Sequence, residues 1–325
     1  MLLMKANRDA ILKPLQTVAG IVERRHTLPI LANVLIRKNA ETVSLLATDV
    51  EIQISTEAEL GGDPGPVATT VAARKLIDIL RSLPESAEVS ISLDNRKASV
   101  RAGKSRFALQ TLGADDYPTV SIAEDSTARF SLPQDRLKHL FHMVHFAMAQ
   151  QDIRYYLNGL LLVTDGDLIR VVATDGHRLA YCQASVEGAG LARQEVIIPR
   201  KTVLELQRLL ADSDDITVAP NQVRFAFGGV EMISKLVEGK FPDYQRVIPQ
   251  GYTRRLLIRR DDLAASLARA SILTTEKFKG VRLAASNQGL KVQISNAEQE
   301  EASDDSEAEY HGDEIDVGFN VSYLL

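Results

Sequence analysis

Cysteine is almost absent from this chain, since Cys182 is the only one in 325 residues. A single thiol excludes an internal disulfide framework and fits a reducing cytoplasm. No apolar run approaches the roughly 18 residues of a membrane span, and the start MLLMKANRDA has no apolar core of signal-peptide length. We therefore expect a cytoplasmic protein that contacts no membrane.

Two motifs typical of enzymes are also missing. There is no G-x-x-x-x-G-K-[ST] sequence, and the glycines of GGDPGP and GAG lack a strand-to-helix context. There is no G-x-S-x-G motif to complete a catalytic triad. Nucleotide hydrolysis is therefore not expected.

Positive charge is missing from one segment near the end. From Glu298 to Asp316 the chain has ten acidic residues and no lysine or arginine. Without these ten charges, the formal net charge of −5 becomes +5. The rest of the chain is thus mildly basic, which permits a polyanion partner without requiring one. The acidic block by itself is typical of a solvated strand edge or a mobile tail.

What the sequence does have is internal repetition. LLATD ends at Asp49 and VVATD ends at Asp175, an offset of 126 residues. The same offset relates two further motifs: Arg74-Lys75 to Arg200-Lys201, and Leu31 and Leu35 to Leu157 and Leu161. Separate motifs that share one offset predict two structural copies.

A third copy follows with a shorter spacing. Leu263 opens an amphipathic stretch 126 residues after Leu137, but beyond it the offset falls to 121, so that Gly280 matches Gly159 and Ser295 matches Thr174. We expect a loop about five residues shorter in copy three, because deletions belong in loops. FNVSYLL then starts the second helix of copy three, and this copy is expected to lack its last helix and final strands, about 45 residues.

Each copy shows the same order of elements. An amphipathic helix comes first, with the apolar stripe Ile11, Leu15, Val18 and Val22 in copy one and, after Pro133, Leu137, Leu140, Phe141 and Val144 in copy two. Short alternating strands follow, and a second helix begins at the Arg-Lys motif. We predict an α+β fold of three repeated domains, 1–125, 126–250 and 251–325, the third incomplete.

Asp175 and His177 resemble an acid/base pair, because residues two apart in a strand point to the same side. Gly176 between them indicates a turn, and copy one keeps the aspartate in LATDVEIQI without the Gly-His-Arg that follows it in copy two. The ATD element is therefore predicted to be scaffold, and GHR to line a binding rim. Plain structure and a hydrolase built on Asp175 and His177 are the alternatives.

His139, His142 and His145 are spaced by three on the helix of copy two. They span about a third of the helix circumference, and no carboxylate or cysteine four residues on fixes a metal geometry. We predict a solvated, partly basic helix face and no metal site.

Basic doublets recur at helix starts and nearby loops: Arg24-Arg25, Arg74-Lys75, Arg200-Lys201, Arg254-Arg255 and Arg259-Arg260. On repeated units they can present positive charge on one shared face, which gives salt-sensitive contact with phosphates that is independent of base sequence. QQDIRYYLNG adds two tyrosines that can stack on bases or sugars.

Seven motifs together resemble the bacterial DNA polymerase III beta subunit family, the sliding clamps: RRHTLPILANVL, QQDIRYYLNG, ATDGHRLA, KFPDYQRVIP, EKFKGVRL, EQEEA and FNVSYLL. The resemblance covers essentially the whole chain. It implies a head-to-tail homodimer that forms a ring around double-stranded DNA, with helices lining a central hole and antiparallel sheets outside. It also implies a processivity factor with no catalytic residues and no cofactor. Its partners would be the DNA polymerase III alpha subunit, the clamp loader and other proteins with clamp-binding peptides.

The resemblance assigns three sets of residues by motif. The DNA-facing set is Arg24, Arg74, Gln150, Gln151, Tyr155, Tyr156, Arg200 and Lys201. The peptide-binding pocket is Leu157, Thr174, Gly176, His177, Arg178, Leu179, Pro242, Arg246, Val247, Phe278, Asn320 and Tyr323. The subunit contact sets Arg101, Lys104, Arg106, Phe107 and Leu109 against Ile272, Leu273, Glu298, Glu300 and Glu301.

The sequence departs from the family in three places. Gln150 stands where many relatives have a histidine, which replaces a charge-capable contact by a neutral one. SDDSEAEY (303–310) is more acidic and less apolar than the strand expected there. The family also continues past FNVSYLL into a helix and strands that complete the third domain and the pocket. The alternative interpretation is a monomeric DNA-binding or regulatory fragment that does not close a ring.

Overall fold

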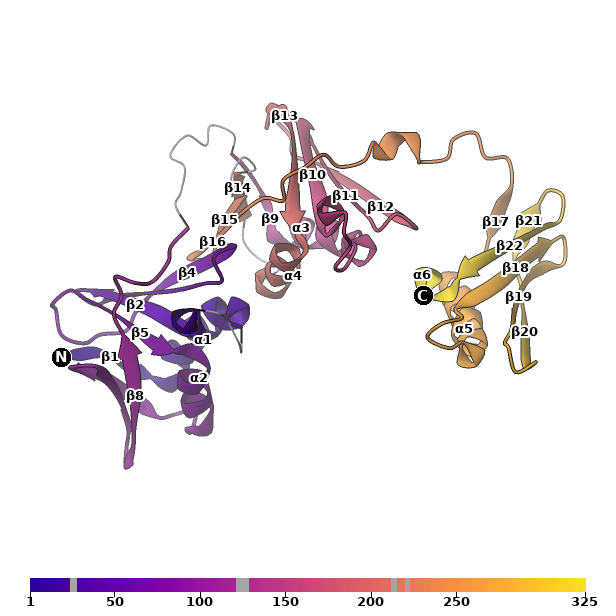
Figure 1. Ribbon diagram of the computed structural model, residues 1–325. Helices are drawn as coiled ribbons and strands as arrows, with labels where there is room; N and C mark the ends of the chain where they lie inside the picture. The colour runs from indigo at the N-terminus through magenta and orange to yellow at the C-terminus, as the bar shows by residue number, and fades with distance from the viewer. Residues whose placement is uncertain (24–27, 121–128, 212–214, 220–222) are drawn as a thin grey trace. The chain divides into compact units, whose positions relative to one another are not determined.

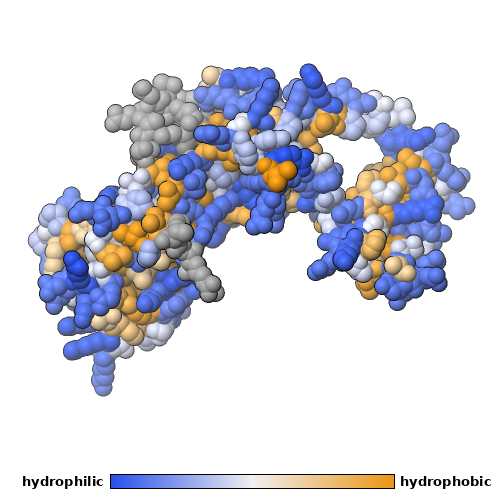
Figure 2. Space-filling view, in the orientation of Figure 1, coloured by the Kyte–Doolittle hydropathy of each residue, from blue (hydrophilic) through white to orange (hydrophobic). Residues whose placement is uncertain are grey.

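The computed structural model describes residues 1–325 except 24–27, 121–128, 212–214 and 220–222. The chain forms two compact units, Met1–Pro242 and Asp243–Leu325 (Figure 1). Unit 1 holds copy one and copy two up to Pro242, and unit 2 holds residues 243–250 together with copy three. Hydrophilic side chains cover most of the visible surface of each unit, and smaller hydrophobic patches lie among these side chains (Figure 2). Within the described ranges, no helix is long and apolar enough to cross a membrane.

Copy one combines two helices with two sets of four antiparallel strands. Its elements are β1 (Leu2–Asn7), α1 (Arg8–Val18), β2 (Asn33–Asn39), β3 (Thr42–Thr48), β4 (Ile52–Glu59), β5 (Val67–Ala72), α2 (Ala73–Ser82), β6 (Glu88–Asp94), β7 (Lys97–Ala102) and β8 (Ser105–Leu112). The strand orders are β1-β6-β7-β8 and β5-β2-β3-β4. A short pairing of Thr70 with Leu112 and Val71 with Thr111 joins β5 to β8.

Copy two repeats this plan. Its elements are β9 (Phe130–Pro133), α3 (Gln134–His142), β10 (Gly159–Gly166), β11 (Leu168–Thr174), β12 (Leu179–Ser185), β13 (Leu191–Pro199), α4 (Arg200–Leu209), β14 (Asp215–Ala219), β15 (Arg224–Phe227) and β16 (Val230–Ser234). The strand orders β9-β14-β15-β16 and β13-β10-β11-β12 correspond to those of copy one. The predicted two-fold repeat is therefore confirmed as a structural repeat.

The two copies share one sheet through β4 and β16. These strands pair antiparallel from Val230 opposite Thr56 to Ser234 opposite Ile52. Met232 and Ile54 face each other in this pairing, and both are fully buried in the core that runs through unit 1. The junction is therefore held by a ladder of backbone hydrogen bonds and by shared apolar burial.

The helices bury the apolar stripes that the sequence predicts. Helix α1 begins after Asn7, whose side chain accepts a hydrogen bond from the Asp9 amide at 3.0 Å, a regular N-cap. The stripe of copy one (Ile11, Leu15, Val18 and Val22) and that of copy two (Leu137, Leu140, Phe141 and Val144) are all buried in the core. The helices are shorter than predicted, however, because α1 ends at Val18 and α3 at His142, so Val22 and Val144 lie beyond them. Helices α2 and α4 carry the Arg-Lys motif in their first turns, as expected.

Unit 2 repeats the first helix, the four-stranded set and the start of the second helix of the other two copies. Its elements are β17 (Arg255–Leu257), α5 (Arg260–Ala270), β18 (Gly280–Ser286), β19 (Gly289–Ser295), β20 (Glu301–Ser306), β21 (Glu309–His311), β22 (Ile315–Asn320) and α6 (Val321–Leu324). The sheet order β20-β19-β18-β22 matches that of β12-β11-β10-β13. Asn320 caps α6 by accepting the Ser322 amide at 3.0 Å, which confirms the start of the second helix.

The acidic sequence SDDSEAEY enters β20 and β21 despite its composition. Side chains of β20 alternate between exposed and half-buried, and the half-buried Asp304 pairs with Arg269 of α5 at 2.5 Å. A strand with one solvated face tolerates acidic residues on that face. The segment therefore forms the edge strand that its position in the repeat requires.

Candidate functional site

Asp175 is a turn cap. Its Oδ1 accepts hydrogen bonds from the amides of His177 (2.9 Å) and Arg178 (3.0 Å), and its Oδ2 accepts from Nε of Arg178 (3.1 Å). Burial raises the pKa of the Asp175 carboxyl, but the two amides and the Arg178 guanidinium outweigh burial and hold the pKa below its usual range. A carboxylate held in this way stabilises the loop and is poorly suited to act as a base.

Copy one contains the same turn, which confirms that the ATD element is shared scaffold. Asp49 Oδ1 accepts the amides of Glu51 (3.0 Å) and Ile52 (2.7 Å). The preceding threonine of each copy, Thr48 or Thr174, donates its hydroxyl at 2.7 Å to a carbonyl four residues later. The two turns differ in what the second aspartate oxygen binds, because Asp49 Oδ2 accepts from Lys201 at 2.5 Å.

The turn also requires one residue with a positive φ. Gly176 has φ +88° and its counterpart Val50 has φ +78°, a conformation that disfavours β-branched residues. We expect Val50→Gly to raise the free energy of unfolding by about 1 kcal/mol. The strain at such a residue costs about 1–3 kcal/mol, which exceeds the extra chain entropy of a glycine, roughly 0.5–1 kcal/mol. Urea unfolding measures the change; Val67→Gly, in strand β5 and without a positive φ, should be destabilising.

The pocket residues of unit 1 lie around the turn and a neighbouring loop. Thr174 and Leu179 face each other at the ends of β11 and β12, and Leu157 is buried in a short 3-10 helix, Tyr155–Leu157. The Arg154 guanidinium donates to the carbonyl of Asp175 at 3.2 Å, which ties the loop to the turn. Arg154 also binds Asp152, which lowers the pKa of that carboxyl to about 2.

The Arg178 side chain is held from its other side by a residue that the sequence did not indicate. It donates to the carbonyl of Phe146 at 2.7 Å, and its guanidinium lies 5.5 Å from the centre of the Phe146 ring. Phe146 is an exposed aromatic in no recognised motif, so only the folded loop reveals this contact. Gly176 and His177 are exposed at the tip of the turn.

The remaining pocket residues belong to the end of unit 1 and to unit 2. Pro242 ends unit 1. In unit 2, Arg246 pairs with Asp243 at 2.9 Å, and Val247 and Phe278 are 64% and 66% exposed. Asn320 is occupied as the cap of α6, and Tyr323 lies within that helix. The two units are separate bodies, so a pocket that combines these residues with those of unit 1 stays a prediction.

The arginines of the two Arg-Lys motifs have equivalent contacts. Arg74 donates to the carbonyl of Val22 at 2.9 Å, and Arg200 donates to the carbonyl of Met148, 126 residues further on, at 3.4 Å. Burial, and then the nearby Arg178, lower the pKa of Arg200. Each arginine therefore also ties its helix to the residue that follows a 3-10 helix, Ala19–Ile21 in copy one and His145–Ala147 in copy two.

The other residues of the DNA-facing set differ in exposure. Gln150 and Gln151 are exposed, and Tyr155 is exposed beside the half-buried Tyr156, with the two rings edge to face at 6.0 Å. Lys201 binds two carboxylates, Glu23 at 2.6 Å and Asp49 at 2.5 Å. Arg24 lies outside the described residues.

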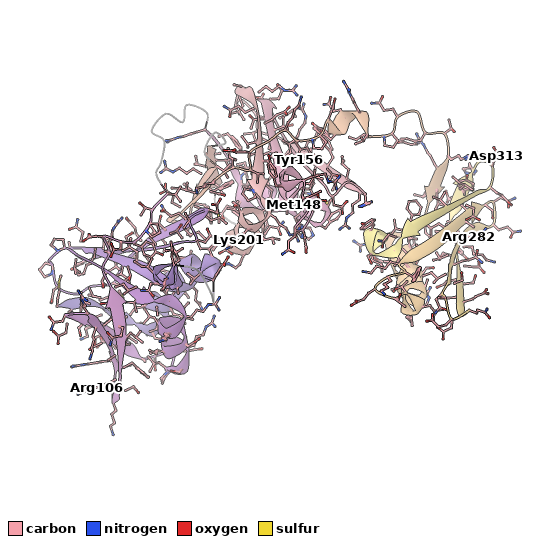
Figure 3. All side chains as sticks on the ribbon, in the orientation of Figure 1. Arg106, Met148, Tyr156, Lys201, Arg282 and Asp313 are labelled. Atoms are coloured by element: carbon pink, nitrogen blue, oxygen red, sulfur yellow. The ribbon has the colours of Figure 1, made fainter. Side chains whose placement is uncertain are left out.

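The residues of the predicted subunit contact lie on the β7–β8 hairpin of copy one and, in unit 2, on the 3-10 helix after α5 and around the turn before β20. In β8, Arg106 is exposed and Phe107 and Leu109 are half-buried; Arg106 lies near the end of the β7–β8 hairpin (Figure 3). Arg101 and Lys104 are exposed beside it. On unit 2, Ile272 is 78% exposed and Leu273 is half-buried. Glu298 and Glu300 are exposed in the turn before β20, and Glu301 is its exposed first residue.

The three histidines lie on a solvated surface, as expected, but not on one helix, because α3 ends at His142 and His145 begins a separate 3-10 helix, His145–Ala147. His139 and His142 are exposed and His145 is half-exposed, with its Nδ1 3.0 Å from the carbonyl of His142. Among the described residues, no group of three or more His, Cys, Asp or Glu side chains is arranged to hold a metal ion.

Comparison with known proteins gives consistent matches along the chain. Models of the N-terminal, central and C-terminal domains of the DNA polymerase III beta subunit match residues 2–121, 131–243 and 245–325. The beta sliding clamp of Pseudomonas aeruginosa is 47% identical over 321 residues, covering 98% of this chain and 87% of the relative. That of Escherichia coli K12 is 46% identical with the same coverage.

Solved structures agree with these matches. A crystal structure of the DNA polymerase III subunit beta from Pseudomonas aeruginosa superposes with a TM-score of 0.95 at 45% identity, covering 100% of this chain and 88% of that chain. A DNA polymerase sliding clamp from Caulobacter crescentus gives 0.91 at 35% identity, covering 99% and 88%.

The repeated fold, the capped Asp175 and these matches define a DNA sliding clamp, a non-catalytic factor of DNA replication built from three clamp domains. The chain belongs to the DNA polymerase III beta subunit family. The hydrolase alternative is thereby excluded, and the alternative of a separate regulatory fragment is not favoured.

Proposed function

We propose that two copies of this chain join head to tail into a ring that encircles duplex DNA without reading its sequence. Each of the two chains would contribute three domains, 1–125, 126–250 and 251–325. The ring tethers the replicative polymerase and other proteins that carry clamp-binding peptides. It works in the cytoplasm, where Cys182 stays a free thiol.

The observation that carries this proposal is the β4–β16 junction inside unit 1. The equivalent strands elsewhere are open: within the described residues, β20 pairs only with β19, and Ser105–Gln110 of β8 pair only with β7. Exposed strand edges attract further strands. A second chain can pair its β8 edge with β20 of the first chain and its β20 edge with β8 of the first chain. Two such joints close a ring.

The register of this joint follows from the repeat. Hairpin turns pair Phe227 with Val230 in β15–β16 and Ala102 with Ser105 in β7–β8, so Met232 corresponds to Phe107. Turns also pair Thr48 with Gln53 in β3–β4 and Ser295 with Glu301 in β19–β20, so Ile54 corresponds to Ala302.

By analogy with the pairing of Met232 with Ile54, Phe107 of one chain would lie opposite Ala302 of the other on the inner face. On the outer face, Arg106 would lie opposite Ser303, with Glu301 and Asp305 as its diagonal neighbours. A basic edge therefore meets an acidic edge, which favours head-to-tail association over association of like edges.

Contact with DNA would be electrostatic and tolerant of sequence. The proposed set is Arg24, Arg74, Gln150, Gln151, Tyr155, Tyr156 and Arg200, with phosphate contacts from the arginines and stacking or polar contacts from the others. Peptides would bind to the residues around Gly176 together with Pro242, Arg246, Val247, Phe278, Asn320 and Tyr323. The mix of apolar and small residues suits hydrophobic peptide anchors.

Retention on DNA of different topology tests the proposal. Loaded onto nicked circular DNA by a clamp loader, the chain should stay bound in high salt, since a closed ring is not held by phosphate contacts alone. Cutting the circle once should release it, because a ring slides off an end. Equal loss from circular and linear DNA would contradict encirclement.

A further inference from the structure

We propose that Lys201 is a positioning residue that locks the first two copies together, and that it is not a phosphate contact. Its side chain lies where α4 meets copy one (Figure 3). This role goes beyond the proposed ring, because it concerns a joint inside one chain. The Arg-Lys motif of copy two, both residues of which were predicted to face DNA, would then give different functions to its arginine and its lysine.

The geometry around Lys201 is that of a charge clasp. Its ammonium donates to Glu23 Oε1 at 2.6 Å and to Asp49 Oδ2 at 2.5 Å, both residues of copy one. The Asp49 side chain is only 8% exposed. Asp49 Oδ1 accepts hydrogen bonds from the amides of Glu51 and Ile52, so contacts within copy one already fix the orientation of the carboxylate. Burial lowers the pKa of Lys201, but the bonds to Asp49 and Glu23 outweigh it and raise the pKa above its usual range.

The charge balance of the cluster disfavours a phosphate. One ammonium between two carboxylates leaves a net charge of −1, and a phosphate would have to displace at least one carboxylate to bind. A site that attracts polyanions carries the opposite sign. The positive charge of Lys201 is therefore already balanced by carboxylates of the protein.

Two further cations of copy two reach copy one at the same junction. Arg208 of α4 donates to the carbonyl of Thr17 at 2.8 Å, and Lys235 donates to Glu51 at 3.4 Å. The chain approaches so closely here that a Cβ added to Gly20 would lie 2.0 Å from Glu205 Oε1. Lys201 is the member of this set whose partner is almost fully buried, so it constrains the junction most.

The repeat supplies a contrast. Lys75 is the counterpart of Lys201, 126 residues earlier, and it is exposed on α2 with no ion pair within 4.0 Å in the part of the chain that the structure describes. In copy two, the second oxygen of Asp175 is occupied by Arg178. The clasp therefore belongs to the junction and is not a general feature of the motif.

The test combines a double-mutant cycle with a salt titration on the 325-residue chain. Lys201→Met keeps the aliphatic stem and removes the charge, and Asp49→Asn keeps the oxygen that caps the turn. We expect each to lower the folding equilibrium constant about two- to fivefold, with a non-additive double variant, as for partly exposed ion pairs. Lys201→Arg should restore most of the loss, and Lys75→Met, the matched control, should be additive with Asp49→Asn.

The salt dependence of binding to linear duplex DNA separates the two roles. Removal of a phosphate contact reduces the slope of log affinity against log salt by about 1. We expect Lys201→Met to keep the slope of the unaltered chain. A reduced slope, or an unchanged slope with no coupling to Asp49→Asn, overturns the proposal. The double-mutant cycle measures folding stability and needs neither DNA nor a ring. Its result therefore tests the role of Lys201 even if the chain is not retained on circular DNA.

Discussion

Ile272→Asp is expected to leave the chain folded and to prevent dimer formation. Ile272 is 78% exposed in the segment Ser271–Leu273 that follows α5, so its replacement removes no core contact. In the proposed ring, this side chain would be buried against β8 of the partner chain, and the two-fold arrangement would repeat the contact at both joints. Burying one such side chain contributes about 1.5–3 kcal/mol, so both joints together lose roughly 3–6 kcal/mol. The dimer dissociation constant should rise about a hundredfold or more.

Sedimentation over a concentration series measures this change. The matched control is Ile153→Asp, which puts the same charge at a position that is 94% exposed and outside the proposed joint. It should leave the dissociation constant unaltered. An Ile272→Asp chain that dimerises as tightly as the control would show that the joint lies elsewhere.

Most of the fold was predictable because the sequence repeats. The offset of 126 between Asp49 and Asp175 relates two turns with the same hydrogen bonds, and the stripe led by Ile11 is buried as its spacing predicted. Repeats reveal local structure, since equivalent segments meet equivalent neighbours. They also showed that the aspartate beside His177 was scaffold, a conclusion that the pair taken alone did not allow.

Contacts between copies could not be predicted in the same way. Lys201 and Asp49 are 152 residues apart and carry no shared motif, so their ion pair appears only when α4 is brought against copy one. The turn between β19 and β20 is one residue longer than its counterparts, because Ser295 pairs with Glu301 where Thr174 pairs with Leu179. The offset of 121 was derived from matches up to Ser295, so it does not include this insertion. The insertion moves every residue of β20 one position further along the sequence than the offset predicts.

Gly176→Val is expected to weaken binding of clamp-binding peptides at least tenfold. A Cβ at this position would lie 3.0 Å from both terminal nitrogens of Arg154, so a valine displaces the guanidinium that ties the loop to the turn. Copy one shows that the turn itself accepts this residue, because Val50 occupies the equivalent position with φ +78°. The backbone should therefore keep its shape, and the loss of affinity should come from the added valine side chain at the proposed peptide-binding pocket.

Titration of a labelled clamp-binding peptide, followed by fluorescence anisotropy, measures the effect. Gly188→Val is the matched control, because Gly188 has φ +73° and a Cβ there meets nothing within 4 Å. Both variants bear the strain of a valine at positive φ, about 1–3 kcal/mol, so both should lose similar thermal stability. Only the variant at position 176 should lose peptide affinity. Equal affinities in the two variants would mean that peptides do not contact the Gly176 turn, and GHR would then be a purely structural feature of copy two.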